Sequence, residues 1–178
     1  MKKKIITVLI ILMITQHSCK EVDKFTQFDM EYTSSITIPS STIINIPFNV
    51  NTPDVQSNSK STFEGNDTRA DLIEEISLTK SVLTITSPSD GNFNFLKSVA
   101  IYINAEGLSE SKIAWKDNIP NNSEKTLNLE TTGSDLKEYI KKDEFTLEVE
   151  TVTDETIAVD HKIDVYSVFH VDAKILGQ

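Results

Sequence analysis

Apolar and polar residues alternate one by one over the last part of the chain, between residues 157 and 175. The apolar side chains fall on odd positions, namely Ile157, Val159, Ile163, Val165, Phe169, Val171, Ala173 and Ile175. The polar ones fall on even positions, namely Asp160, Lys162, Asp164, His170, Asp172 and Lys174. A period of two residues is typical of a β-strand with one buried side. At ~3.3 Å per residue the segment would reach about 63 Å, too long for such a domain, so we expect a break near Tyr166–Ser167, where the strand can switch sheets.

The same alternation recurs in shorter segments that are separated by turn residues. It predicts strands near residues 28–38, 44–50, 76–87, 99–105, 113–115, 127–129 and 145–149. In the second segment Ile44 and Ile46 are expected to face inward, and Pro47, which has no N–H to donate, favours an edge position. In the third segment the apolar parity shifts between Val82 and Leu83, as a β-bulge would produce.

Two segments show helical spacing instead. Thr68 can cap a helix that extends to Ile76, and Ser134 can cap a second helix over residues 136–140. The stretch 51–60 is rich in Asn and Ser and predicts a surface loop. About eight or nine strands and two short helices predict a mainly β fold, and we expect an antiparallel immunoglobulin-like β-sandwich, with a small barrel as the second choice.

The single cysteine, Cys19, follows an apolar stretch near the start of the chain. Three lysines precede residues 5–15, and this apolar run of eleven residues is too short to cross a bilayer but has the length of a signal-peptide core. Gln16 is not a small residue, so a plain secretory cleavage pattern fits poorly. We expect residues 1–18 to be a signal peptide that is removed from the mature protein.

Ser18–Cys19 resembles the end of the lipobox in bacterial lipoprotein precursors, in which the cysteine becomes the acylated first residue. Gln16 and His17 depart from that pattern, and a free thiol after an ordinary signal is the alternative. The charged segment Lys20–Lys24 resembles the tether of Bacteroidota-type lipoproteins exported to the cell surface, although Val22 interrupts its acidic pair. The resemblance implies a lipidated Cys19, a tether over residues 19–26 and an outer-membrane anchor. The protein would be surface-exposed or, as the alternative, periplasm-facing.

The remainder, residues 27–178, is expected to form a single β-sandwich domain. Its stretches SPSDGNFNFLKSVAIYINAEGL and DLKEYIKKDEFTLEVET resemble small β-sandwich lipoproteins of the same kind. That resemblance implies no particular activity and transfers no functional residue. The sequence has no second cysteine, so the domain is expected to be stable without disulfide bonds.

The charge of the chain is strongly negative. The formal net charge is −10, and removal of the leader with its three lysines lowers it to −13. Nucleic-acid binding draws on clustered Lys and Arg, so no nucleic-acid partner is expected. The same charge argues against a domain that lies flat on an anionic bilayer.

Catalytic and metal-binding motifs are absent from the sequence. There is no G-x-S-x-G, H-E-x-x-H or phosphate-binding glycine-rich segment. His170 and Asp172 share the outward parity of the last strand and are the candidate metal ligands, while His161 falls on the apolar parity and is interpreted as a structural histidine. We therefore expect no cofactor and no catalytic residues.

Aromatic side chains are the candidates for ligand contact. Tyr102 and Tyr166 fall on outward parities, whereas Trp115 shares the parity of Ile113, which favours a core position for Trp115. The leading hypothesis is a membrane-anchored, non-catalytic binding or assembly module of the cell envelope, whose partners are other envelope proteins or glycans. The alternatives are a glycan-binding component of a surface uptake system, which an exposed Trp115 would favour, and a metal-dependent envelope enzyme.

Overall fold

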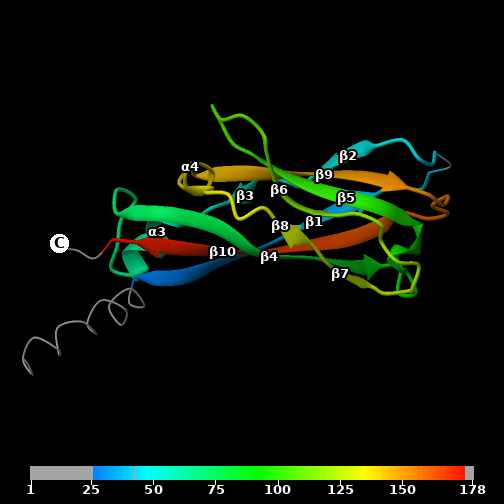
Figure 1. Ribbon diagram of the computed structural model, residues 1–178, viewed down its shortest axis with the longest axis horizontal. Helices are drawn as coiled ribbons and strands as arrows, with labels where there is room; N and C mark the ends of the chain where they lie inside the picture. The colour runs from blue at the N-terminus through cyan, green and yellow to red at the C-terminus, as the bar shows by residue number, and fades with distance from the viewer. Residues whose placement is uncertain (1–25, 42, 175–178) are drawn as a thin grey trace, which may run out of the picture.

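Two antiparallel sheets pack face to face in the computed structural model, which describes residues 26–41 and 43–174 (Figure 1). The four-stranded sheet has the order β1 (Gln27–Ile38), β10 (His161–Ala173), β4 (Ile73–Ser87) and β7 (Thr126–Asn128). The six-stranded sheet has the order β2 (Phe48–Asn51), β9 (Glu144–Thr153), β5 (Leu96–Asn104), β6 (Ser111–Lys116) and β8 (Glu130–Thr131), and β3 (Val55–Gln56) also pairs with β9. The connections contain α3 (Ser59–Gly65), α4 (Lys137–Ile140) and the 3₁₀ helix η2 (Phe93–Phe95). The predicted signal peptide, Cys19, the tether up to residue 25 and Ile175 lie outside the described residues.

The predicted mainly β, antiparallel sandwich with two short helices is confirmed. The described residues form ten strands, and β3, β7 and β8 are only two or three residues long. Such short strands leave little alternation to detect, which explains the lower number expected from the sequence.

The order of the strands is that of a jelly roll. The first half of the chain pairs with the second half in reverse, because β1 pairs with β10, β2 with β9, β4 with β7 and β5 with β6. This nested pairing is how a jelly roll divides its strands between two sheets. An immunoglobulin-like sandwich instead places its first two strands side by side, whereas β1 and β2 lie in different sheets. Alternation assigns a face to each side chain but no neighbour to each strand, so it cannot separate the two arrangements.

Strand β10 runs without a break through the place where the sequence suggested one. All thirteen residues from His161 to Ala173 form a single strand between β1 and β4. Ser167 keeps its inward position and is buried opposite Ser81 and Tyr32. The strand begins only at His161, which shortens it to about 43 Å and removes the need for a bend.

The bulge predicted in β4 is present at a different residue. Val168 pairs with Lys80 and Phe169 with Leu78, so the unpaired residue is Thr79. An extra residue reverses the parity of everything that follows it. The shift of apolar parity that the sequence shows between Val82 and Leu83 therefore begins three residues earlier, at Thr79.

Two other local predictions are wrong in position. The first helix is α3, within and after the segment expected to be a loop, and the predicted helix near Thr68 is replaced by a turn and the start of β4. Ile44 and Ile46 are exposed because β2 begins only at Phe48, after Pro47. The edge position of β2 is confirmed. The second helix, α4, is confirmed, although the N–H of its first residue, Lys137, donates to the carboxylate of Asp135 and not to Ser134.

The core lies between the two sheets. Its largest fully buried side chains are Phe63, Phe145, Phe169, Ile38, Ile76, Leu78, Leu83, Leu96, Ile101, Ile103, Ile113 and Leu136. Gln27 pairs with Asp172, so the first strand starts and the last strand finishes at the same end of the sandwich, beside α3 (Figure 1). No helix among the described residues has the length and apolarity that a membrane crossing needs.

Candidate functional site

Trp115 lies on the outer face of the six-stranded sheet and not in the core. In the β5–β6 ladder Ala114 pairs with Ile101 and Lys112 with Tyr102, so Ile113 is the extra residue of a β-bulge. Ile113 and Ala114 are both fully buried. The bulge turns Trp115 outward, where it pairs with Ala100 and is partly exposed. The predicted core position of Trp115 is therefore wrong, because parity cannot be followed across a bulge.

Trp115 and Tyr102 share this face with carboxylates and carboxamides. One row of the sheet contains Asn49, Glu150, Ala100, Trp115 and Glu130. The next row contains Asn51, Glu148, Tyr102 and Lys112. We call the surface formed by Ala100, Tyr102, Lys112, Trp115, Glu148 and Glu150 the aromatic face. Ala100 is only 7% exposed, which shows that its larger neighbours cover it.

The charges on the aromatic face are arranged around its two rings. The Lys112 ammonium lies over the indole of Trp115, 5.6 Å from the ring centroid, in a cation–π arrangement. Burial raises the pKa of the Tyr102 hydroxyl, and Glu150, Glu110 and Glu148 raise it further by their negative charge. The Asn49 amide donates a hydrogen bond to Glu148. The face therefore combines two aromatic rings with several hydrogen-bond acceptors and one cation.

Tyr166 lies on the opposite side of the molecule. Its hydroxyl donates a hydrogen bond to Glu31 at 2.7 Å, and the Lys80 ammonium lies 5.5 Å from its ring centroid. The bond to Glu31 is the main reason why the pKa of Tyr166 is raised. The structure thus brings together two of the three predicted aromatic contacts and separates the third.

The candidate metal ligands are not gathered into a metal site. His170 Nδ1 contacts Asp29 at 2.8 Å on the outer face of the four-stranded sheet, and Asp172 pairs with Gln27 and Glu75 one row further. Within residues 26–41 and 43–174, no group of three His, Cys, Asp or Glu side chains is placed to hold a metal ion. His161 is at the other end of β10, about 30 Å from His170 along the strand, so the two histidines do not share a site.

His161 has the structural position that its parity indicated. It is 8% exposed, its Nδ1 lies 2.9 Å from the carbonyl oxygen of Val159, and its ring lies 4.7 Å from that of Phe95. It also lines a cleft of about 340 Å³ together with Asp90 and Glu155.

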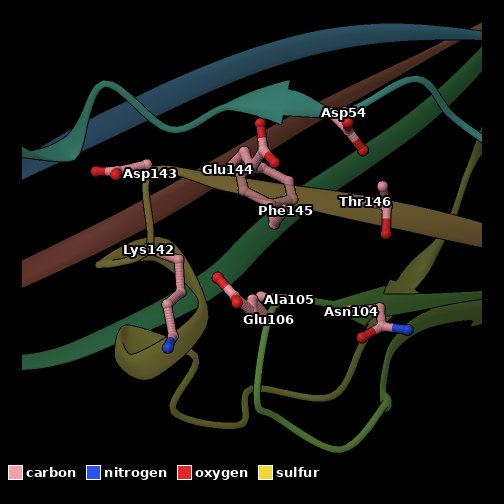
Figure 2. A pocket seen from close by; sticks show the side chains of 9 residues that line it. All are labelled: Asp54, Asn104, Ala105, Glu106, Lys142, Asp143, Glu144, Phe145 and Thr146. Carbon is pink, nitrogen blue, oxygen red and sulfur yellow. The ribbon is translucent and has the colours of Figure 1, made fainter.

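A second hollow, which the sequence did not indicate, opens near α4 where β9 begins and β5 ends. It has a volume of about 400 Å³ and is lined by Asp54, Asn104, Ala105, Glu106, Lys142, Asp143, Glu144, Phe145 and Thr146 (Figure 2). Four of these residues are acidic and one is basic, so the cleft is electronegative. The acidic residues at the ends of strands are the one sequence feature that could have indicated it. Trp115, Tyr102 and Tyr166 line neither this cleft nor the one at His161.

Comparison with known proteins identifies no family for this chain. No family model matches the chain, and no curated protein matches its sequence. Among solved structures, a Desmodium yellow mottle tymovirus chain is 14% identical over 85% of each chain, with a TM-score of 0.28. A carbohydrate-binding module of the β-sandwich superfamily is 8% identical over 86% of this chain and 58% of that chain, with a TM-score of 0.31. Likeness at this level carries no argument about function.

Proposed function

We propose that this chain is a lipid-anchored, non-catalytic binding module of the cell envelope, and that the aromatic face contacts its ligand. The observation that carries the proposal is the bulge at Ile113, which turns Trp115 out of the core and places it beside Tyr102. Trp and Tyr are enriched in recognition surfaces because each buries a large apolar area and keeps a polar atom for hydrogen bonding. An outward Trp on a folded sheet contributes little to the core, so a ligand contact accounts for it best.

The anchor is supported by the leader. Residues 2–15 have the basic and apolar segments of a signal peptide, and Cys19 follows them directly. A cysteine with two or three acyl chains would hold the domain stably, since each buried CH₂ contributes ~0.8 kcal/mol. The chain from Cys19 to Gln27 would span at most about 28 Å when fully extended, so the sandwich would stay close to the outer membrane. We propose the cell surface as its location, with the periplasmic side as the alternative.

A glycan is the second candidate for the ligand. A sugar ring presents apolar C–H groups on its faces and hydroxyls at its edge, so it needs an aromatic platform bordered by hydrogen-bond acceptors. Trp115 and Tyr102 supply the platform, and Glu148 and Glu150 supply the acceptors on the adjoining strand. The face would then serve the glycan-binding component of an uptake system.

The anchor can be tested by metabolic labelling with a palmitate analogue. The wild-type chain should incorporate the label, and a Cys19→Ala variant should lose it completely. Label that persists in Cys19→Ala would exclude lipidation at this residue. Protease treatment of intact cells then distinguishes the surface from the periplasmic side, because only a surface protein is digested without lysis.

The binding face can be tested by placing a photo-crosslinking amino acid at single positions of the full chain in its native envelope. Cross-links to a protein partner should form from Trp115 and Tyr102, and Tyr166 is the control, as an outward tyrosine of the opposite face. Cross-links from Tyr166 alone would contradict the assignment. Affinity electrophoresis in gels that contain soluble polysaccharides tests the glycan alternative, in which a retarded wild-type band should recover its mobility in Trp115→Ala.

A further inference from the structure

Strand β1 is a long edge strand with one free side. It has twelve residues and pairs with β10 from Gln27–Asp172 to Ile38–His161 without a register shift. In the described part of the chain β1 forms a ladder with β10 alone. The other edge strands are much shorter, since β2 has four residues, β7 three and β8 two.

The free side of β1 lacks the usual protection of an edge. Proteins block such edges with short strands, bulges, proline or charged side chains, lysine above all, because an unpaired row of N–H and C=O groups is a template for another strand. Residues 27–38 contain no proline and no lysine, their ladder has no bulge, and their two charged side chains, Asp29 and Glu31, are engaged by His170 and Tyr166 of β10. In contrast, β2 is short and is preceded by Pro47.

The core is also incompletely closed along this side. Partly buried apolar side chains pack against the core from the three strands that border it, namely Phe28 and Tyr32 on β1, Phe48 and Val50 on β2, and Val55 on β3. The Tyr32 hydroxyl donates a hydrogen bond to the carbonyl oxygen of Ser57 at 2.6 Å, which links the two sheets there. An open hydrogen-bonding edge and an apolar seam therefore lie next to each other.

We propose that β1 pairs antiparallel with β1 of a second copy of this chain, about a two-fold axis at Thr33. An isologous contact of this kind requires a strand that is complementary to itself. On the outer side, pairing about Thr33 places Glu31 opposite Ser35 and Asp29 opposite Thr37, so carboxylates face hydroxyls and no two acids are directly opposed. Within one copy the Ser35 hydroxyl donates its single proton to Asp164 at 2.6 Å, so the outer side contributes the absence of opposed acids and not a new hydrogen bond.

The inner side favours this register over pairing about Tyr32, and the length of β1 favours it over pairing about Ser34, which would place Phe28 beyond the end of the partner strand. Pairing about Thr33 sets Met30 opposite Ile36 and Phe28 opposite Ile38, which are apolar pairs of the kind that stabilise a sheet. Pairing about Tyr32 would set Met30 opposite Ser34. A shift by one residue would bring inner side chains against outer ones. The two four-stranded sheets would then form one continuous sheet across both copies.

Cysteine cross-linking of the full chain in its native envelope tests the pairing. Directly opposed residues of antiparallel strands have Cα atoms about 4.5–5.5 Å apart, within the range that a disulfide accepts. Thr33→Cys should give a dimer on a non-reducing gel that disappears on reduction. Thr126→Cys, exposed on the other edge strand of the same sheet, is the matched control and should stay monomeric, as should the wild type with Cys19 alone.

The mass of the detergent-extracted protein gives an independent measurement. The wild type and Thr126→Lys should have the mass of a dimer in light scattering, whereas Thr33→Lys should be monomeric, because it brings two ammonium groups together at the axis. Thr33 is exposed, so an unchanged circular dichroism spectrum should accompany the loss of the dimer. A monomeric wild type, a dimeric Thr33→Lys or equal cross-linking of both cysteine variants would overturn the proposal. A cross-link from Thr33→Cys to a different protein, with no homodimer, would overturn it as well.

Discussion

On the outer face of the four-stranded sheet, polar side chains of neighbouring strands bond to one another. His170 contacts Asp29, and Tyr166 donates to Glu31. On the outer face of the six-stranded sheet, Trp115 and Tyr102 lie among Glu148 and Glu150. The first face consists largely of satisfied pairs, and the second, apart from the bond that Asn49 donates to Glu148, exposes part of an indole and a cluster of acceptors.

This difference between the two faces indicates which of them is available to a ligand. A ligand that approaches the four-stranded sheet must compete with existing side-chain hydrogen bonds, and each replaced bond gives little net free energy. A ligand on the aromatic face gains apolar contact with Trp115 and new hydrogen bonds. One extra residue, Ile113, creates the difference, because it reverses the side of the sheet to which the residues after it point.

The largest effect is expected from Ile113→Ala. Ile113 is fully buried, so truncation should lower the free energy of unfolding by ~2–5 kcal/mol. Ile163→Ala, equally buried on a central strand of the other sheet, should cost a similar amount. Only Ile113→Ala should also change the emission spectrum of Trp115, since only that substitution alters the bulge. Urea unfolding measures the first quantity and tryptophan fluorescence the second, and an identical spectrum in both variants would contradict the role assigned to the bulge.

The next effect concerns ligand affinity. Trp115→Ala should weaken binding of the native ligand at least tenfold, which corresponds to about 1.4 kcal/mol. Tyr166→Ala should leave the affinity unchanged because Tyr166 lies on the opposite face. Titration calorimetry with the partner or polysaccharide identified by cross-linking or electrophoresis gives both values. Equal losses in the two variants would mean that the faces do not differ in function.

In regular strands the sequence predicts correctly which side chains face the core. The inward residues of β10, such as Ile163 and Phe169, follow parity from one end of the strand to the other. Parity fails wherever the ladder has an extra residue, at Thr79 in β4 and at Ile113 in β6. The failure at Ile113 is why Trp115 was expected in the core and why the aromatic face could not be assembled from sequence.

The predicted helix positions are wrong for a different reason. Ile73 and Ile76 have helical spacing, but pairing of Ile73 with Ala173 and of Ile76 with Val171 draws them into β4. Long-range pairing of this kind outweighs a local propensity of a few tenths of a kcal/mol per residue. Helix α3 has no amphipathic pattern, and its one buried apolar side chain, Phe63, packs it against Phe28 at 6.3 Å between ring centroids.

A smaller effect is expected on the polar face. Asp29→Asn should lower the free energy of unfolding by less than about 1 kcal/mol, because both partners of the His170 pair are substantially exposed to water. Urea unfolding measures it. A loss as large as that of Ile113→Ala would show that the polar face supports the fold more than its exposure indicates.

The smallest effect concerns the pKa of one tyrosine on each face, which is raised by a different cause in each case. The pKa of Tyr166 is raised mainly by its hydrogen bond to Glu31, so Glu31→Gln should return it toward the ordinary value. The pKa of Tyr102 is raised mainly by burial, so Glu148→Gln should leave it above that value. In both cases the folded protein keeps its proton to higher pH than the unfolded chain, and stability should fall as the pH rises from the ordinary tyrosine pKa near 10 toward the raised value. Titration of the tyrosine ring signals by NMR tests both variants. If Glu148→Gln restored Tyr102 fully, charge and not burial would dominate on the aromatic face, and that face would be more open to water than its neighbours suggest.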